Sequence, residues 1–530
     1  MRTALAASLL ALAATPLAAM DSHIVGPRAL GMGGTGTAAT DDHTAAFWNP
    51  GMYGFFGRTG EEDARLPADP NFVGRKDWGV GLADVGVQVE VRGQLADWVQ
   101  QLEGVDLGGL ADLGGADATA DDLQVAMTAV SLIQSFNAKV DNAVVLVDAG
   151  VLDLRIMHVG IGLRQFTEGI VSVADLDRIN LGFGANTAAI LTGITNVAAT
   201  PAGWTAGHTP TLITGATADA VAQALGAASY AAANATQQEA ISKLDYAAGQ
   251  AGLTPEQVAA MGAAGGALNL ALNATGDIED NQTAVFTGGF NVTEVPLTVG
   301  WAFNDHFSFG GNLKLMVGRV AAAKVRLQSE TDDLASLLQD AFDESKQTVT
   351  AGLDLGMVAR CSWAQAGLTV RNLNRPVLKG GEFRDADGQP FTVDDVDLDP
   401  QAALGVALYP WETVCLTADI DLTENRTIIA TTSGRTMAAG INPRLEVAYA
   451  TQRLGAGVEW NALRFLALRA GASKDLAESE TGTMLHAGLG LNLWALRFDL
   501  AGAVSTETAT VDGTDYPRAI NVGVGLTVDF

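Results

Sequence analysis

Two features of the sequence could in principle bind a phosphate or a metal ion. The glycine-rich stretch at 31–36 superficially resembles a phosphate-binding loop, but it does not follow a predicted strand and lacks the Gly-Lys-Ser/Thr that such loops require. The histidines lie at positions 23, 43, 158, 208, 306 and 486, without the His-x3-His type of spacing seen in zinc sites. We therefore expect no nucleotide, no metal ion and no cofactor.

Two aspartates, Asp419 and Asp421, stand two residues apart and could form a carboxylate pair for acid–base catalysis. Pairing with an arginine such as Arg371, Arg469 or Arg497 is the favoured alternative. No nucleophile-and-base pattern accompanies the aspartates. The sequence therefore predicts no catalytic residue and a protein that is not an enzyme.

The composition indicates what kind of scaffold carries these residues. Charged residues make up 17% of the chain, against about 25% in an average soluble domain, and 61 residues are glycine. The 60 acidic residues outnumber the 31 basic ones, which gives a formal net charge of -29. Such a surface lacks the basic footprint that nucleic-acid binding needs. Low charge, many glycines and 48% hydrophobic residues favour a large all-β barrel.

The N-terminus predicts the compartment. Arg2 precedes a stretch of small and apolar residues at 4–14, and further small residues follow up to Ala18 and Ala19. This pattern is typical of a secretory signal peptide, which we place at 1–19, with a buried N-terminal helix as the alternative. No other apolar run reaches the ~18–20 residues of a membrane-spanning helix. The sequence therefore indicates a periplasmic, extracellular or outer-membrane barrel protein.

The alternation of apolar and polar residues in the predicted strands distinguishes among these three classes of protein. Residues 520–530 alternate between apolar residues on one face and glycine or polar residues on the other. An outer apolar band, a polar inner face and strands of about 9–11 residues are the signature of a membrane barrel. The pattern recurs from residue 295 onward, and we expect three earlier strands at 79–91, 148–156 and 157–166. The sequence thus predicts an outer-membrane antiparallel β-barrel over 78–530 with about 14 strands (roughly 12–16), and 283–293 as a competing strand.

Connection lengths give an independent test of this topology. Short turns alternate with long connections at about 329–346, 374–400, 425–443, 474–482 and 506–518. Outer-membrane barrels have short periplasmic turns and long extracellular loops. The intervals 93–141 and 216–272 have helical spacing, as does the shorter piece 332–344. We expect helical extracellular inserts there, with low-complexity linkers as the alternative for the first two.

The segment after the signal peptide resembles a known family. Residues 26–52 are rich in glycine and alanine, contain Asp41-Asp42 and end in Phe47-Trp48-Asn49-Pro50-Gly51. This resembles the N-terminal signature of FadL-like outer-membrane barrels, although Gly51 stands where that family usually has alanine. In that family the segment forms a hatch inside the barrel. The resemblance therefore implies a luminal hatch within residues 20–77.

Later segments narrow the resemblance. The stretches 366–373, 404–408, 416–425 and 466–471 are similar to the barrel family called conjugal transfer protein TraF. The likeness covers about 24–91 and 295–530 and leaves out the helical inserts. The thioredoxin-like TraF of conjugation machinery is a different type of protein, and no Cys-x-x-Cys motif supports redox chemistry here.

A lumen of about 14 strands is too wide for wall side chains to fill, so it also needs a plug on physical grounds. The residues expected to anchor and gate the hatch are Arg28, Asp41, Asp42, Trp48, Asn49 and Pro50. Those expected to face the lumen are Lys314, Asp354, Arg371, Asp419, Asp421, Arg469, His486, Arg497 and Asp499. Because unpaired buried charge is costly, we expect the two hatch aspartates to meet inward cations such as Lys314, Arg371 or Arg497.

The two cysteines are expected to be free. Cys361 is predicted to point outward and Cys415 inward, on strands three positions apart around the barrel. With about 4.8 Å between strands, their Cα atoms should lie about 14 Å apart. A disulfide allows only about 4.4–6.8 Å.

The resemblance to FadL-like proteins implies passive transport of a small hydrophobic molecule through a gated lumen in the outer membrane of a Gram-negative bacterium. The alternative is an envelope interaction or assembly protein of the TraF type that binds envelope proteins through its extracellular inserts. Expected partners are outer-membrane lipid, a small hydrophobic ligand and the barrel assembly machinery, with Phe530 as the C-terminal assembly signal. Nucleic acid is excluded as a partner.

Overall fold

The structure, a computed structural model of the 530-residue chain, describes residues 23–56, 77–95, 141–177, 200–250, 281–326, 340–435 and 442–529, apart from positions 226, 344, 464, 512 and 513. The predicted signal peptide, Phe530, most of the insert at 93–141 and residues 251–272 of the second insert lie outside the described residues.

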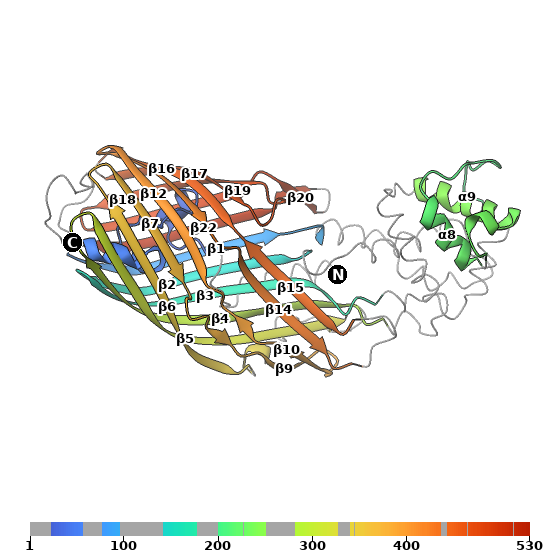
Figure 1. Cartoon of the computed structure of the whole chain (residues 1–530), viewed down its shortest axis with the longest axis horizontal. Coiled ribbons are helices and arrows are strands. Elements are labelled where there is room, and N and C mark those ends of the chain that lie inside the picture. Colours follow the sequence, from blue (N-terminus) through green and yellow to red (C-terminus); the bar gives the residue numbers. More distant parts are fainter. Residues whose placement is uncertain are drawn as a thin grey trace.

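Fourteen antiparallel strands form one closed barrel (Figure 1), as predicted. Strands whose apolar residues alternate with glycine and polar residues can present one face to apolar surroundings and the other to a lumen. The first strand pairs with the last, with Val85 opposite Val524, which closes the ring. In ring order the strands are β1 (Trp78–Val91), β2 (Ala143–Ile156), β3 (Val159–Ala174), β4 (Ala284–Ala302), β5 (Phe307–Arg326), β6 (Gln347–Arg360), β7 (Ala364–Arg371), β12 (Gln401–Trp411), β13 (Val414–Asp421), β16 (Arg453–Leu463), β17 (Leu466–Asp475), β18 (Thr483–Leu493), β19 (Leu496–Ser505) and β22 (Ala519–Asp529).

Several strands are longer than their sequence pattern suggested. β2 begins at Ala143 rather than near 148, and β3 continues to Ala174. The competing strand at 283–293 is not separate, because it forms the first part of the 19-residue β4. Its inward residues Phe286 and Phe290 are apolar and fully buried. The outward residues at this end include Thr287 and Asn291, so apolar and polar residues alternate here in the reverse sense to the membrane-barrel pattern on which the prediction depended.

Short and long connections alternate around the barrel, as the sequence indicated. Only Met157 and His158 separate β2 from β3, and residues 412–413 separate β12 from β13. The antiparallel order places all such short turns at one end of the barrel, where β22 also ends (Figure 1). We call this the short-turn end and the opposite one the long-loop end.

The outer surface carries an apolar band with aromatic residues at its border. Val299, Leu313 and Leu315 are 50%, 59% and 52% exposed. Aromatic girdles mark the membrane–water interfaces of membrane barrels. Exposed aromatic side chains gather in the same way near the short-turn end, at Trp301, Phe303, Phe307, Trp363, Trp411, Phe465 and Trp494.

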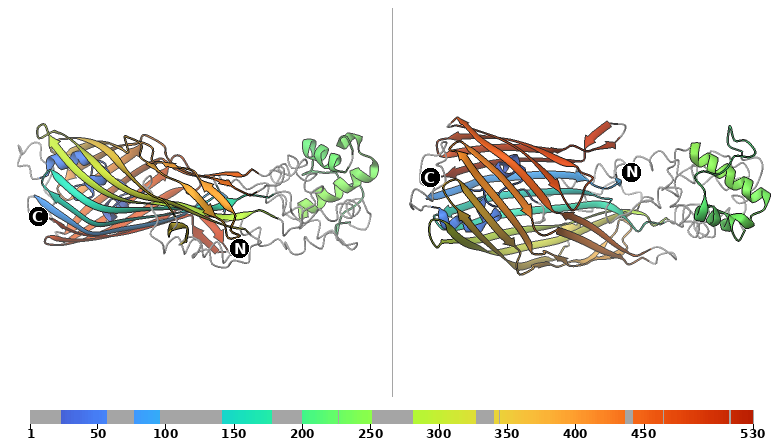
Figure 2. Two further views of the ribbon diagram at one scale, coloured as in Figure 1. Left: turned by 90° about the horizontal axis from the view of Figure 1, so that it is seen from below. Right: turned by 45° about the horizontal axis from the view of Figure 1, so that its top comes forward.

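Residues 23–56, which we call the luminal segment, lie inside the barrel in its short-turn half (Figure 2). They contain the helices α2 (Pro27–Gly31) and α3 (Ala45–Trp48) and the 3-10 helix η1 (Pro50–Phe55). Helix α2 contacts β18, β19 and β22, whereas η1 contacts β4, β5 and β6. These two sets of strands lie on different sides of the ring, so the segment spans the lumen from wall to wall.

A four-stranded sheet, which we call the inner sheet, belongs to the long-loop half. Its strand order is β15 (Arg444–Thr451), β14 (Asn425–Ser433), β10 (Pro390–Val393) and β9 (Gly381–Arg384). The sequence pattern predicted connections at 374–400 and 425–443 and no strand at β15. Most of these strands are shorter than a barrel strand and pair with one another, so the barrel-length pattern used for prediction is absent there. Two small two-stranded sheets complete the strands: β8 (Val377–Leu378) with β11 (Val396–Asp397), and β20 (Thr508–Val511) with β21 (Thr514–Pro517).

The second predicted insert contains helices α8 (Gly215–Ala224) and α9 (Ala235–Gln250), with the 3-10 helix η4 (Tyr230–Ala232) between them. They lie beyond the long-loop end of the barrel (Figure 1) and have their own apolar core, which includes Ile213, Val221 and Ile241. Of the piece predicted at 332–344, residues 340–343 are helical. None of the described helices is long and apolar enough to cross a membrane.

Candidate functional site

Glycines on the inner wall receive the backbone of the luminal segment. A side-chain carbon added at Gly310 of β5 would meet the backbone of Pro50, and one added at Gly367 of β7 would meet the backbone of Thr37. Only glycine allows two backbones to approach so closely. The glycine-rich inner face that predicted a barrel therefore also forms the seat of the segment. Further seat positions, facing backbone atoms of residues 32–33 and 53–54, are Gly300, Gly455, Gly457 and Gly471.

Arg28 is the centre of a buried ion network. Its guanidinium donates to both carboxylate oxygens of Glu459 on β16, at 2.9 Å each, and to Asp41 at 2.9 Å. It also donates to the backbone carbonyl of Ala39 at 2.7 Å. Arg469 on β17 donates to the same Glu459 carboxylate at 2.7 Å. Bidentate, charge-assisted hydrogen bonds of this kind fix both position and orientation, so they hold helix α2 against the wall.

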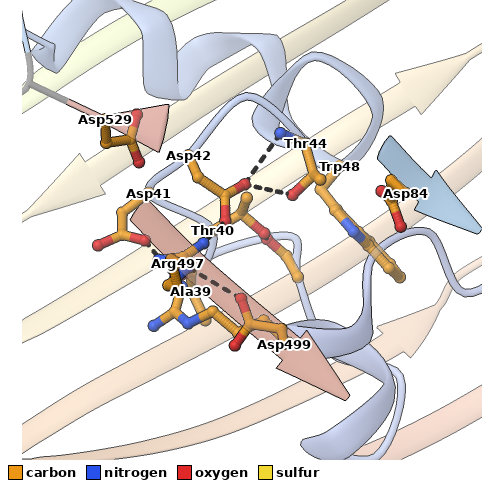
Figure 3. Close-up of polar contacts among 12 residues, drawn as sticks. Ala39, Thr40, Asp41, Asp42, Thr44, Trp48, Asp84, Arg497, Asp499 and Asp529 are labelled. Carbon is orange, nitrogen blue, oxygen red and sulfur yellow. Dashed lines mark hydrogen bonds and ion pairs between the residues drawn. The ribbon is translucent and has the colours of Figure 1, made fainter. Parts of the chain in front are cut away.

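Asp42 joins the luminal segment to β19. Its carboxylate pairs with Arg497 and accepts hydrogen bonds from the backbone N–H and the hydroxyl of Thr44 (Figure 3). Burial favours the neutral carboxyl, but Arg497, His43 and Thr44 outweigh it and hold the pKa of Asp42 well below its usual value. Asp499, two residues along β19, lies 2.9 Å from Arg497 on the same strand. Asp42 is therefore a charged anchor at neutral pH.

The two hatch aspartates have different cation partners. Arg497 of the wall pairs with Asp42, and Arg28 of the segment itself pairs with Asp41. Because Arg28 also reaches the wall, the segment brings its own counter-charge. The spacing of the wall residues could not predict this.

The other two expected cations have different neighbours. Lys314 of β5 lies 3.2 Å from Glu294 and 3.0 Å from Asp354 on the adjacent strands. The Arg371 guanidinium lies over the ring of Phe47 in the luminal segment, 4.3 Å from the ring centroid. One cation therefore supports the wall and the other contacts an aromatic side chain of the segment.

The carboxylates of Asp419 and Asp421 accept hydrogen bonds from different elements. The Asp419 carboxylate accepts hydrogen bonds from the backbone N–H groups of Gly36 and Thr37, at 2.8 and 2.7 Å. The Asp421 carboxylate accepts one from the backbone N–H of Arg453 at 2.9 Å. Asp419 is thus a further anchor of the segment, and among the described residues no group of three His, Cys, Asp or Glu side chains could hold a metal ion.

The Asn-Pro turn fixes the direction of the segment. The Asn49 side chain accepts a hydrogen bond from the Gly51 N–H at 3.0 Å and so caps η1. Its amide group donates to the carbonyl oxygens of Thr37, at 3.0 Å, and of Met357 on β6, at 3.1 Å. Pro50 occupies the first helical turn, where the N–H that it lacks has no partner in the helix. The turn therefore joins two parts of the segment to the wall.

The inner sheet packs apolar side chains against the inner face of the wall in the long-loop half. Ile429 of β14 and Val447 of β15 are fully buried and belong to one apolar cluster with inward residues of β3, β4 and β5. The cluster continues into the luminal segment. Its larger members include Ile24, Phe47, Trp48, Phe166, Phe286, Phe290, Met316 and Phe391.

The β14–β15 hairpin crosses the lumen. It leaves the wall between β13 and β16, yet the Tyr449 hydroxyl donates to Glu90 on β1 at 3.2 Å. The Arg92 guanidinium lies 4.6 Å from the centroid of the Tyr449 ring and donates to the Ala450 carbonyl. The hairpin therefore contacts the opposite side of the ring from its own attachment.

Two cavities between the segment, the wall and the inner sheet are small. One of about 10 Å³ is lined by residues that include Trp48 and Asp419. The other, of about 50 Å³, is lined by residues that include Ile24, Glu90 and Tyr449. An engineered cavity that holds benzene measures about 150 Å³. Neither space would hold a molecule of that size.

Comparison with known proteins gives the family. A family model described as "F plasmid transfer operon, TraF, protein" matches residues 49–421, which is more than half of the chain. The chain belongs to this family. The TraF-family match begins at the Asn-Pro turn and ends with β13. No curated protein sequence gave a significant match.

Several solved structures are similar to this TraF-family chain. The Ralstonia pickettii toluene transporter TbuX is 12% identical, with 95% of this chain and 98% of that chain covered and a TM-score of 0.41. The P. putida toluene transporter TodX is 12% identical, with coverage of 95% and 98% and a TM-score of 0.42. A Pseudomonas aeruginosa FadL homologue is 11% identical, with coverage of 97% and 100% and a TM-score of 0.45.

Both cysteines of this TraF-family chain are free, as predicted. Cys361 is partly exposed, whereas Cys415 on β13 is only 4% exposed. Cys415 packs in one apolar cluster with Met32, Ala38 and Ala39 of the luminal segment. Its thiol therefore lies beneath the segment.

Sequence reasoning missed three parts of the site. It placed Glu459 on the polar face of its strand but gave it no role, although it is the one carboxylate in the 453–463 strand. It interpreted the inward glycines as a barrel signature and not as a seat. It gave no role to Tyr449 and its hairpin, for which the sequence carries no signal of a contact across the lumen.

Proposed function

We propose that this chain is an outer-membrane barrel of a Gram-negative bacterium that lets a small hydrophobic molecule cross through a lumen gated by the luminal segment. The apolar outer band and its aromatic border support a location in a membrane. We also propose that the barrel assembly machinery recognises Phe530 at the C-terminus.

One observation carries the proposal: a continuous apolar cluster extends along the inner wall from the inner sheet to the luminal segment. Phe391 and Val447 lie at the long-loop side of this cluster, and Phe47, Trp48 and Ile24 lie at the segment. A lumen that passed ions or polar solutes would not need a buried apolar interior. A hydrophobic molecule that moves along this cluster could contact its side chains one after another and stay in apolar surroundings throughout.

The proposed gate is the luminal segment, anchored by polar contacts to the wall. Arg28 and Asp42 hold it through ion pairs, and the Asn49-Pro50 turn holds it through backbone carbonyls. Trp48 closes the segment on itself, because its indole N–H donates to the Val25 carbonyl at 2.8 Å. Such polar links can be exchanged for water when the segment moves, which suits a part that must open and close.

Uptake of a hydrophobic fluorescent probe by intact cells tests this function. N-phenyl-1-naphthylamine becomes fluorescent in lipid and is slowed by an intact outer membrane. We expect Gram-negative host cells that produce the parent protein to take it up several-fold faster than cells without it. Ile429→Asn places an amide in the apolar cluster, where an unpaired polar group is unfavourable, so it should slow uptake.

The matched control is the neighbouring residue. Ile428 is 39% exposed whereas Ile429 is fully buried, so Ile428→Asn makes the same chemical change outside the path. Heat-modifiable mobility on a gel checks that each variant has assembled. Uptake that is equal in cells with and without the parent protein would refute the transport proposal.

A second function, binding of an envelope partner through the inserts, is supported by a different observation. Residues 200–250 have their own core and a specific polar centre, in which Asp245 accepts hydrogen bonds from the N–H groups of Thr211, Leu212 and Ile213 at 2.6–3.0 Å. Burial raises the pKa of Asp245, but these N–H groups and His208 outweigh it and lower the pKa overall. A pore needs no such module outside its barrel.

Affinity capture tests the second function. Envelope proteins that co-purify with the parent chain but not with a variant lacking 200–250 would support it. Asp245→Asn keeps the side chain shape and weakens only the polar centre, so it should reduce capture of the same proteins. Identical sets of co-purifying proteins for the parent and the deletion would refute it.

A further inference from the structure

Histidines gather where the luminal segment meets the wall. His23 and His43 belong to the segment, while His158 and His486 belong to the wall and reach the segment. Four of the six histidines of the chain therefore lie at one boundary. Histidine is the side chain that normally changes charge between about pH 5 and 8, so these contacts can differ between the neutral and the charged ring.

The two wall histidines bind carbonyl groups of the segment. The Nδ1 atom of His158 lies 2.9 Å from the Tyr53 carbonyl oxygen, and that of His486 lies 2.8 Å from the Leu30 carbonyl oxygen. A carbonyl oxygen only accepts, so both Nδ1 atoms carry a proton. They carry it in the neutral ring and in the charged ring alike. These two contacts therefore persist when the pH falls.

His23 contacts the wall through a carboxylate and an aromatic ring. Its Nδ1 lies 3.8 Å from the Asp148 carboxylate on β2, and its ring contacts Phe166 edge-on with 5.3 Å between the ring centroids. Both groups therefore lie within reach of the His23 ring.

His43 differs from the other three. It is 3% exposed, and its ring lies against β1, where a side-chain carbon added at Gly81 would collide with it. Among the described residues, neither ring nitrogen has a hydrogen-bond partner. A neutral ring leaves one donor and one acceptor without partners, whereas a charged ring would leave two donors and a charge.

Charged groups surround His43 from each element packed on it. Burial has the largest effect and lowers the pKa of His43 from its ordinary value of 6.5, although the neighbouring carboxylates oppose this. On β1 itself, the Asp84 carboxylate lies 3.4 Å from the Arg164 guanidinium, so these two groups form an ion pair with each other. The groups that act on His43 directly are Asp42 of the segment, Asp153 of β2, Arg164 of β3 and Asp529 of β22.

We infer that docking of the luminal segment is linked to protonation of His43, so that mild acid loosens the segment from the wall. The direction of the pH effect follows from comparing the docked segment with the free one. A histidine that titrates lower when docked than when free contributes to docking above its free pKa, and this contribution is lost as the pH falls through the free value towards the docked one. The ion pair of Asp42 persists over this range, because the pKa of that carboxyl is already low.

This linkage is a property of docking and goes beyond the proposed transport function. A protein that carries no hydrophobic molecule could still show it. The test therefore measures the position of the segment and not uptake.

Cys415 reports on docking because its thiol lies beneath Ala38 and Ala39. Cys361→Ser leaves Cys415 as the only thiol. Labelling with 4,4′-dithiodipyridine, which also reacts in mild acid, is measured at about pH 7.5 and pH 5.5, the interval in which histidine titrates. The same protein in denaturant gives the intrinsic reaction rate at each pH. We expect the protected thiol to react several-fold faster at the lower pH after this correction.

Two variants separate His43 from the other histidines. His43→Gln removes the titrating group, so Cys415 should show no acid-dependent rise. His158→Gln removes a carbonyl contact that is present in both charge states, so labelling should be faster at both pH values with the rise retained. A parent thiol equally protected at both pH values would overturn the inference, as would a His43→Gln variant that keeps the full rise.

A second measurement needs no variant. An NMR titration of the histidine rings in the parent protein gives the pKa of His43 in the docked state directly. A value at or above that of a free histidine would overturn the inference, and a value below it would support it.

Discussion

The two halves of the lumen are closed by different physics. In the short-turn half, the luminal segment rests on glycines and is held by ion pairs and backbone hydrogen bonds, with Arg28, Glu459 and Asp419 at the centre. In the long-loop half, the inner sheet is held by buried apolar side chains such as Ile429 and Val447. One barrel therefore combines a closure positioned by specific polar contacts with a closure held by apolar contacts.

The energetics of the two closures differ accordingly. A buried ion pair roughly balances the cost of taking its charges out of water, so it specifies a position more than it stabilises it. An apolar side chain gains about 1.5–3 kcal/mol from full burial, with no charge to desolvate. The luminal segment also buries apolar side chains, among them Leu30, Phe47 and Tyr53, so its ion pairs specify where it docks and its apolar side chains help to hold it there.

Removing the closures separately and together should have the largest effect. Deleting 24–52, replacing 425–451 by a short flexible linker, and combining both changes should each leave an assembled barrel, because the wall strands pair with one another. We expect the double variant to conduct ions as a wide pore in planar bilayers. The segment deletion should leak less, and the hairpin deletion least. If the segment deletion conducts as much as the double variant, the inner sheet is not a barrier.

Breaking the ion network should release the segment while leaving the barrel folded. Glu459→Gln leaves Arg28 and Arg469 without a shared carboxylate, and the loss of one partner of a buried pair typically costs about 3–5 kcal/mol. Faster labelling of Cys415 measures the release. Glu412→Gln, in the short turn after β12 and outside the network, is the control. Unchanged Cys415 protection in Glu459→Gln would contradict the polar account of docking.

Emptying the apolar core should destabilise the barrel but not the docking of the segment. Ile429→Ala removes a fully buried side chain, which typically costs about 2–5 kcal/mol, whereas the exposed Ile428→Ala should cost far less. Urea unfolding in detergent measures the difference in free energy, and Cys415 labelling under native conditions should stay slow. Rapid labelling in Ile429→Ala would show that the two closures are coupled.

A single methyl group in the seat should give the smallest effect. Gly310→Ala would place a carbon against the backbone of Pro50, and over-packing of this kind typically costs about 1–3 kcal/mol. At Gly502 the nearest atom to an added carbon is 3.5 Å away, so Gly502→Ala is the matched control. Faster Cys415 labelling in the first variant only is the expected result. Equal labelling in both would show that the segment does not press on this glycine.

Much of the wall could be predicted from sequence, because strand periodicity is a local property. Alternation in 295–303 and 520–530 gave the facing of side chains, and connection lengths gave the direction of each strand. The prediction weakened where β4 reverses the membrane-barrel pattern, with Phe286 and Phe290 facing inward. It also failed for the strands of the inner sheet, most of which are too short for their pattern to be distinguished from that of a loop.

The site could be predicted only in part. The types of the anchoring residues were evident, since Asp42, Asn49 and Arg28 are polar residues in an otherwise small-residue segment. Their partners were not, because the Asp42–Arg497 and Arg28–Glu459 pairs join residues more than 400 positions apart. Spacing within a strand contains no information about such pairs.

The sequence by itself determined a fourteen-stranded barrel with an apolar outside, a glycine-rich polar inside and a segment available to enter it. Only the tertiary structure decided what fills the lumen. Periodicity shows which side chains point inward, but whether an inward glycine, glutamate or histidine meets water, the luminal segment or the inner sheet depends on what lies across the ring. That is set by the closure of the barrel, which pairs β1 with β22 and brings strands that are far apart in the sequence around the same space.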